Sequence, residues 1–554
     1  MYKYLFLFFL MLSGVVARAQ HTTGVWDVYQ LGAKGDGKTM DTQAIQSAID
    51  QCHQAGGGKV YLHNGTFLSG TIYLKSNVTL YVEAGATLLG SANVDDYPII
   101  PSKYPSYTGE LVTNKMLIYA EDARAISIQG RGTIDGRGDD FDGPYLSPSF
   151  SGRPRIIHFR NCENVQVRDV TLYNSGSWVQ SYQSCKNMLI DGITVDSREN
   201  KDIEKPRYAT VRGRNTDGLD LVDCERVRIS NCFINSGDDA ICLKSFSPGE
   251  ACRDITITNC IVSSNASGIK IGTETSGAFE DITIQNCVVY DTRVDAISIM
   301  TVDGARVERI NVSNITVRNI KGAAIFIRLG ARNRPYRKDA KINAPILRDV
   351  RVDNVQGTRI GGFGCSVTGL PGMKVENVVL SRINLEFTGG NFPLDVDKST
   401  VASTSAPLTQ AAILQEINRE VPENVKAYPR GEMFGRLPAY GFYIRHVKNI
   451  TLDQVQLRFA QDDHRPALIC DDVEGLELSG LQAQGTSATP ALLRLVNVQN
   501  AVISGSRPIF EVPLFLSVQG KESKGIVLQN NVLKNAKQKV VAEKGAQKSV
   551  VVEL

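Results

Sequence analysis

Three aspartates in the middle of the chain have the spacing of residues that could act together on one substrate. Asp217 lies in the segment NTDG, and the adjacent pair Asp238 and Asp239 follows 21 and 22 residues later. Like charges held close together repel and raise each other's pKa, so a fold usually separates them. These acids are therefore either solvated turn residues or a group in which one carboxyl is kept protonated.

Such a group could cleave a glycosidic bond. One carboxyl must hold a proton to protonate the leaving oxygen, while ionised neighbours deprotonate a water molecule that attacks from the opposite face. A calcium site is the competing interpretation, because clustered carboxylates also suit a hard cation. Two further acids, Asp220 and Asp223, follow Asp217 closely and are expected to face elsewhere.

The fold that positions these acids is indicated by an internal repeat. Each repeat contains two or three short β-branched runs separated by Asn, Gly, Ser or Asp, with no helical segment. The same point in successive repeats is marked, at spacings of 26, 27 and 28 residues, by Ile229, Ile255, Ile282 and Ile310. This period predicts an all-β chain wound as a right-handed parallel β-helix. Residues one coil apart then share a face, which places Asp217 beside Asp238 and Asp239 and favours catalysis over turn chemistry.

Two regions depart from the repeat. Residues 41–54, DTQAIQSAIDQCHQ, have helical spacing and predict a short amphipathic helix that caps the N-terminal end of the solenoid. Residues 390–441 are irregular and proline-rich, with a helix expected in LTQAAILQEINRE, and should lie over one face. The predicted segments are a signal peptide at 1–19, cap and first coils at 20–125, catalytic coils at 126–389, the insertion at 390–441 and C-terminal coils at 442–554.

Composition and the first residues narrow the class of protein. The start, MYKYLFLFFLMLSGVVARAQ, is typical of a signal peptide and too short for a membrane span, so we expect an exported protein, periplasmic or extracellular. The 49 glycines and 7% aromatic residues are typical of a turn-rich β protein. A formal net charge of only +3 predicts no nucleic-acid partner.

Eleven cysteines in an exported chain would ordinarily indicate disulfide bonds. Three of them instead follow asparagines at the repeat period, as Asn231-Cys232, Asn259-Cys260 and Asn286-Cys287. This placement predicts small buried thiols stacked in successive coils, with the asparagines bonded from coil to coil. Cys242 and Cys252 could pair across a short loop.

The motif NTDG, followed one coil later by DD on a predicted β-helix, resembles glycoside hydrolase family 28, the polygalacturonases and rhamnogalacturonan hydrolases. The segments GAKGDGKTMDTQAIQSAIDQC and GGGKVYLHNGTFLSGTIYL also resemble the opening of β-helical pectin-degrading enzymes. The resemblance implies that Asp238 is the general acid and that Asp217 and Asp239 hold and activate the water, with inversion and without metal or cofactor. It implies an acidic plant cell-wall polysaccharide or oligosaccharide as partner, bound by a monomer.

Two motifs of that family are absent. The coil after the acids reads NASGIK, with Ser267 where a Gly-His-Gly histidine is expected, and the next coil reads AISIM in place of Arg-Ile-Lys. The acids are kept but the uronate clamp is not. This favours an exo-acting or rhamnogalacturonan-type enzyme, with the 390–441 insertion narrowing the cleft.

Other residues could contact the substrate. Lys270 and Arg328, near the ends of strands in the following coils, are expected to bind an acidic sugar. Trp178 is either a sugar-stacking platform or a core residue. Lys244 should pair with a nearby carboxylate, and Glu274 could pair with Lys270 or bind sugar hydroxyls.

Two other functions stay open. A β-helical lyase or epimerase would need calcium or a basic residue beside the uronate α-proton. A non-catalytic carbohydrate-binding β-helix would bind sugar without cleaving it, and the paired acids argue most strongly against this one.

Overall fold

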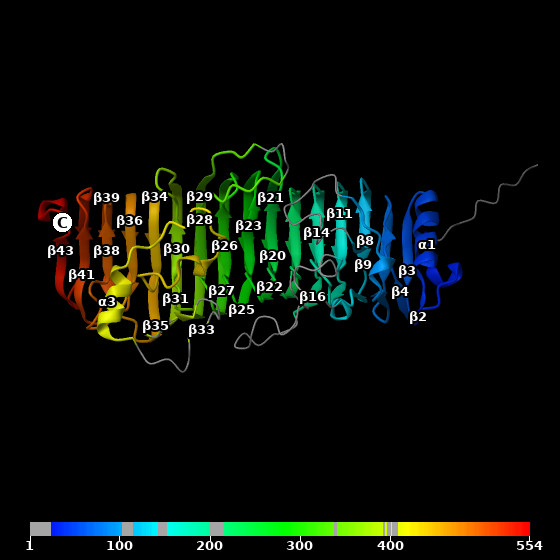
Figure 1. Ribbon diagram of the computed structural model, residues 1–554, viewed down its shortest axis with the longest axis horizontal. Coiled ribbons are helices and arrows are strands. Elements are labelled where there is room, and N and C mark those ends of the chain that lie inside the picture. Colours follow the sequence, from blue (N-terminus) through cyan, green and yellow to red (C-terminus); the bar gives the residue numbers. More distant parts are fainter. Residues whose placement is uncertain are drawn as a thin grey trace, which may run out of the picture.

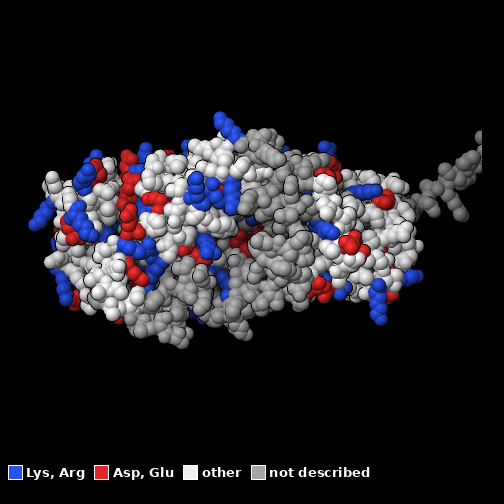
Figure 2. Space-filling view, viewed as in Figure 1, with Lys and Arg blue, Asp and Glu red and all other residues white. Residues whose placement is uncertain are grey.

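The structure, a computed structural model, describes residues 24–101, 115–141, 152–198, 215–336, 341–391, 394–395, 400–401 and 408–554. The expected signal peptide, residues 1–19, lies outside the described residues, so export stays a prediction. Among the described helices, none is long and apolar enough to cross a membrane. Figure 2 shows acidic and basic side chains interspersed over the visible face, consistent with the net charge of +3.

The chain is a right-handed parallel β-helix, as predicted, in which each coil stacks on the next (Figure 1). Strands of successive coils pair in parallel along three rows. The first row, which carries the aspartates, contains β8 (Met116–Glu121), β11 (Arg155–Arg160), β14 (Gln180–Gln183), β17 (Leu219–Val222), β20 (Ile241–Ser245), β23 (Ile269–Thr275), β26 (Ile297–Thr301), β28 (Ile325–Leu329), β30 (Cys365–Thr368), β34 (Phe442–Asp453), β36 (Leu468–Ser479) and β38 (Leu493–Val496).

The other two rows complete each coil. The second row contains β9 (Arg124–Gln129), β12 (Glu163–Arg168), β15 (Lys186–Asp191), β18 (Glu225–Ser230), β21 (Ala251–Thr258), β24 (Ala278–Gln285), β27 (Arg306–Ile320), β29 (Ile346–Ile360) and β31 (Val375–Gly389). The third row contains β10 (Thr133–Asp135), β13 (Thr171–Tyr173), β16 (Thr194–Ser197), β19 (Phe233–Ser236), β22 (Ile261–Ser264) and β25 (Val288–Thr292).

The register of the repeat differs by two residues from the prediction at one coil. Ile255 pairs with Ile282, which pairs with Ile310, as expected, but the partner of Ile255 in the preceding coil is Val227, and Ile229 pairs with Ile257. Alternate strand residues point to the same side, so Val227 and Ile229 are both buried and the apolar pattern fits either register.

The Asn-Cys ladder is present and its thiols are buried and free. Asn231, Asn259, Asn286 and Asn314 all have positive φ between 55° and 58°. Nδ2 of Asn259 donates to Oδ1 of Asn231 at 3.3 Å, and Nδ2 of Asn314 donates to Oδ1 of Asn286 at 3.1 Å. Asparagine suits this position because it tolerates the left-handed conformation and bonds the next coil.

The suggested Cys242–Cys252 disulfide is wrong, because both thiols are free. Sγ of Cys242 contacts the carbonyl oxygen of Gly272 at 3.0 Å, whereas Sγ of Cys252 contacts that of Lys244 at 3.3 Å. The two side chains therefore make their contacts with different strands.

Helix α1 (Thr42–Gln54) lies at the N-terminal end of the solenoid (Figure 1). Its buried side chains are the four apolar residues of the predicted spacing, Ile45, Ala48, Ile49 and Cys52, and they belong to the main core. The helix is thus present as predicted, and its capping function stays a prediction.

The second predicted helix is α3 (Gln410–Asn418), which lies against the outside of the C-terminal coils (Figure 1). The chain after it runs over the first row of strands. Val421, Phe434 and Leu437 form one buried apolar cluster with Met300 of β26 and Phe326 of β28. The insertion therefore covers the outer face of the sheet in the coils that follow the aspartates.

Candidate active site

The register of the first row brings Asp217 and Asp239 together. Asp217 comes two residues before Leu219 and Asp239 two residues before Ile241, and these two strand residues are paired. The amide of Gly218 donates to the carbonyl oxygen of Asp239 at 2.9 Å, which extends the pairing into the turns. Asp217 and Asp239 are buried, whereas Asp238 is more exposed.

Lys270, on the next coil, forms an ion pair with Asp239. Its Nζ lies 2.7 Å from Oδ2 of Asp239, and the amide of Ser267 donates to Oδ1 at 3.0 Å. Burial by itself raises the pKa of the Asp239 carboxyl, but Lys270 and Lys244 outweigh it and lower this pKa to about 2. Asp239 is therefore ionised over the whole range in which enzymes work.

Lys244 lies among three carboxylates. Its Nζ is 3.1 Å from Glu274, 3.5 Å from Asp220 and 3.8 Å from Asp217. The prediction that Lys244 pairs with a carboxylate is confirmed. Glu274 takes this lysine as its partner rather than Lys270, the partner suggested from the sequence.

Asp220 belongs to the site, so the expectation that it faces elsewhere is wrong. It is the first outward side chain of β17, and Lys244 of the next coil reaches both it and Asp217. Burial raises the pKa of Asp220 to about 7, and burial together with Asp220 and Asp238 raises the pKa of Asp217 well above its usual range. Asp223 does face elsewhere, since its carboxylate bonds the hydroxyl of Ser245 and the amide of Phe246.

The proton of the cluster is thus held most strongly at Asp217 and Asp220. The sequence predicted the same crowding of acids, and the family resemblance implied that Asp238 is the general acid that donates the proton. The reason for the difference is burial: Asp217 and Asp220 are nearly inaccessible to water and share one lysine between them. Because the carboxyls are coupled, the proton belongs to the group rather than to one residue.

Trp178 lies one coil before Asp217, since the amide of Val179 donates to the carbonyl oxygen of Asp217 at 2.8 Å. The ring is only 6% exposed and packs in a small apolar cluster. The Arg155 guanidinium and the Lys244 ammonium lie 4.4 Å and 5.0 Å from its centroid. The ring therefore lies beside the site, in a cluster separate from the main core, and is too buried to be an open stacking platform; a role in substrate binding stays a prediction.

Arg328 is placed away from the aspartates and is 1% exposed. Its terminal nitrogens donate to the carbonyl oxygens of Gly369 at 2.9 Å and Glu423 at 2.7 Å. Glu423 belongs to the insertion. The expectation that Arg328 contacts substrate therefore has no support in this geometry. Its guanidinium donates to carbonyl oxygens of the solenoid and of the insertion, and so holds the two together.

Sequence spacing could not reveal Tyr428 and Asp295. The hydroxyl of Tyr428, in the insertion, lies 3.2 Å from Nζ of Lys270, which is 158 residues away in the chain. Oδ2 of Asp295 accepts from the amide of Gly431, also in the insertion, at 3.0 Å. One signal was available: Met300 and Phe326 are apolar at outward positions of their strands, which indicates that something covers them.

Three ligand atoms that could hold a metal ion lie within 4.8 Å of one another, on Asp217, Asp220 and Cys242. The Lys244 ammonium already serves both carboxylates, and a thiol is a poor ligand for a hard cation. The calcium interpretation of the acids is therefore weaker than the hydrolytic one.

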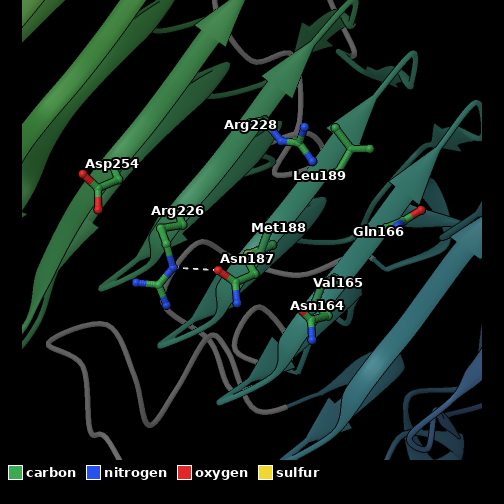
Figure 3. Close-up of a pocket in the computed structure, with 9 residues that line it drawn as sticks. All are labelled: Asn164, Val165, Gln166, Asn187, Met188, Leu189, Arg226, Arg228 and Asp254. Carbon is green, nitrogen blue, oxygen red and sulfur yellow. Dashed lines mark hydrogen bonds between the residues drawn. The ribbon is translucent and has the colours of Figure 1, made fainter.

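A surface hollow of about 430 Å³ lies on another face, on the second row of strands (Figure 3). Its lining comes from β12, β15, β18 and β21 and includes Asn187, Arg226 and Arg228, with Nε of Arg226 donating to Oδ1 of Asn187 at 2.6 Å. None of the predicted site residues lines it. The coupled acids and buried lysines converge on the first row instead, so we assign the site there.

Comparisons with known proteins indicate the family of this chain. The family model "Glycosyl hydrolases family 28" matches residues 52–406. A probable polygalacturonase of Vitis vinifera is 30% identical over 335 residues, which cover 56% of this chain and 63% of the relative. An exopolygalacturonase of Zea mays is 26% identical over 432 residues, 73% of this chain and 93% of the relative.

Among solved structures, a hyperthermoactive exopolygalacturonase from Thermotoga maritima aligns with a TM-score of 0.55 at 24% identity, covering 66% of this chain and 86% of that one. This likeness confirms the fold. The family match includes all the aspartates of the site and confirms the resemblance drawn from NTDG and DD. The chain belongs to glycosyl hydrolase family 28.

Proposed function

We propose that this protein is an inverting glycoside hydrolase that cleaves a galacturonate-containing polysaccharide or oligosaccharide from one chain end. The observation that carries the proposal is the ion-paired carboxylate Asp239 beside the more exposed Asp238, with Asp217 one coil away. Relatives named polygalacturonases support the substrate class.

The roles follow from charge and exposure. Asp239, held ionised by Lys270, accepts a proton from the attacking water. Asp238 is the carboxyl with access to the cleft, and it protonates the leaving oxygen. Asp217 helps to hold the water, which requires it to give up its proton as substrate binds. Because the charges of Asp220 and Asp238 contribute to the raised pKa of Asp217, the proton that it gives up stays within this coupled group of carboxyls.

The retained proton has a simple electrostatic origin. Among the described residues around the site, the cations Lys244, Lys270, Arg155 and Arg332 are outnumbered by the carboxyls Asp217, Asp220, Asp238, Asp239, Glu274 and Asp303. In a buried site such an excess is relieved by proton binding. The proton needed by the leaving group is therefore present without a metal ion.

Action from a chain end is supported by the insertion. The apolar cluster of Met300, Phe326 and Phe434 fills the outer face of the sheet one to two coils beyond Lys270. A polymer lying along the solenoid could not continue past this point. The outer face of the first row is thus covered on one side of the acids, which suits removal of terminal residues.

A lyase or epimerase is not favoured. Such chemistry needs a lysine or other base that can take a proton from carbon. Burial alone would lower the pKa of a lysine, but the anionic neighbours of Lys244 and Lys270 raise both pKa values well above the usual range. Neither amine is then free to act as a base.

The test is a product profile on galacturonan, rhamnogalacturonan and their oligosaccharides, with proton NMR of the first-formed anomer. We expect saturated products of inverted configuration released from one end. Asp238→Asn should lower the rate by roughly 10² to 10⁴, the usual contribution of a general acid. Asp223→Asn, which changes a buried aspartate outside the site, should leave it within a few-fold. Retention of configuration, or an unsaturated product, would refute the proposal.

A further inference from the structure

Tyr428 is an exposed aromatic side chain beside the catalytic ion pair. Its relative exposure is 52%, although Lys270 and Asp239 next to it are buried. The backbone on both sides of it is fixed, because the carbonyl oxygen of Val425 accepts from Ala331 at 3.0 Å and the amide of Gly431 donates to Asp295 at 3.0 Å. The ring is therefore presented to solvent by a held segment.

The phenol hydroxyl of Tyr428 has an unused proton. Its oxygen accepts from Nζ of Lys270 at 3.2 Å and from Oγ1 of Thr273 at 2.8 Å. A phenol has two acceptor sites and one donor, so both acceptor sites are used. Among the described residues none accepts the phenolic proton, which is left for a ligand. The Lys270 ammonium, 5.4 Å from the ring centroid, polarises the same group.

We infer that Tyr428 forms, with Thr273 and the Lys270–Asp239 pair, a sugar-binding subsite at the closed side of the cleft, which takes the terminal ring of an acidic oligosaccharide. This rests on the proposed function and assigns it a recognition residue. The exposed face of the ring suits stacking under a sugar, and the phenolic proton is placed to bond a ring or carboxylate oxygen.

The choice of a terminal ring follows from what lies beyond Tyr428. Phe434, six residues later, is buried against Met300 and Phe326, so the insertion covers the outer sheet face of these coils. A sugar stacked on Tyr428 would therefore be the last one on that side. The insertion would then both end the cleft and bind the residue at its end.

The test compares Tyr428→Ala, Tyr428→Phe and Phe510→Ala. Phe510 is a matched control, since its ring is 56% exposed and lies far along the solenoid, after β38. With a galacturonate trisaccharide as probe, we expect Tyr428→Ala to raise KM about tenfold and Tyr428→Phe about threefold, as for loss of a packing contact plus a hydrogen bond and of the hydrogen bond alone. Both variants should change kcat less than KM, and Phe510→Ala should change neither.

A second arm separates this inference from the proposed function. Calorimetric binding of the same trisaccharide is measured in the inactive Asp238→Asn protein with and without Tyr428→Ala. Loss of about tenfold in affinity supports the subsite even if the reaction class is wrong. Unchanged KM in both Tyr428 variants together with unchanged affinity for Tyr428→Ala, or a fall in kcat with KM unchanged, would overturn it. If wild-type protein cleaves no pectic substrate, the proposed function fails instead.

Discussion

Replacement of Lys270 by methionine should convert Asp239 from a carboxylate that never binds a proton into one that titrates in the working range. The ammonium and the carboxylate are 2.7 Å apart and both are buried. At an effective dielectric constant of ~20, unit charges at this distance attract by roughly 6 kcal/mol. If Lys244 and entering water replace half of this attraction, the half that is lost still raises the pKa of Asp239 from about 2 to roughly 4 or higher.

The assay is the pH dependence of kcat/KM on a galacturonate oligosaccharide between pH 3 and 8. The base must be ionised, so wild-type protein should show no loss from Asp239 in this range. In Lys270→Met a new acid limb should appear near pH 4 to 5, with the deficit against wild type growing about tenfold per pH unit below it. Lys270→Arg keeps the charge and should keep the wild-type acid limb, even if the larger guanidinium lowers the rate at every pH.

The free energy of unfolding of Lys270→Met should also depend on the protonation of Asp239. A carboxyl whose pKa is lowered by folding contributes stability above its unfolded pKa, and this contribution is lost as pH falls towards the folded value of about 2. Removal of Lys270 leaves a buried unpaired charge, at a cost of roughly 3 to 5 kcal/mol near neutral pH. The cost should shrink at pH 4, where the variant's Asp239 is partly protonated. Coincident acid limbs in Lys270→Met and wild type would refute the assignment of Asp239 as the base held by Lys270.

Three further predictions concern the scaffold. Cys232, Cys260 and Cys287 should resist alkylation in the native protein and react after unfolding; a disulfide between any two of them on peptide mapping would contradict the ladder. Asn259→Ala should destabilise by about 1 to 2 kcal/mol more than Asn259→Gly in urea unfolding, because alanine is strained at φ of 55° and glycine is not; equal costs would exclude backbone strain as the cause. Burial raises the pKa of Asp223 to about 7, so the folded state binds more protons than the unfolded state between pH ~4 and 7. As the pH rises through this window, the free energy of unfolding should therefore fall, by up to roughly 4 kcal/mol from this group. Asp223→Asn should flatten that slope, and an unchanged slope would show that Asp223 is not responsible.

The features that could be predicted from the sequence are those set by the coil period. The parallel β-helix, the buried thiols and the pairing of Asp217 with Asp239 all depend on residues about one coil apart. The register at Val227 could not be predicted from the coil period. A strand buries alternate residues, so the pattern of apolar side chains alone does not distinguish two registers that differ by two.

The features that could not be predicted depend on contacts that do not recur from coil to coil. Tyr428 contacts Lys270, which is 158 residues away in the chain. The guanidinium of Arg328 donates to carbonyl oxygens of Gly369 and of Glu423 in the insertion, away from the aspartates. The pKa distribution among Asp217, Asp220 and Asp239 depends on where two lysines point. Lys244 is shared by several acids, whereas Lys270 is committed to Asp239.

The missing uronate clamp and the insertion are best understood as one change. In the coil that lacks Arg-Ile-Lys, Met300 is fully buried against the insertion's Phe434, and the hydroxyl of Ser298 bonds the buried carboxylate of Asp295, which also accepts from Gly431 of the insertion. The side chain at position 300 thus lies against Phe434 and the other apolar residues of the insertion, on the face that the clamp would use in this coil. Among the described residues of the insertion, Tyr428 is the one in hydrogen-bond contact with Lys270, so the insertion that covers the clamp position also places a candidate recognition residue beside the acids.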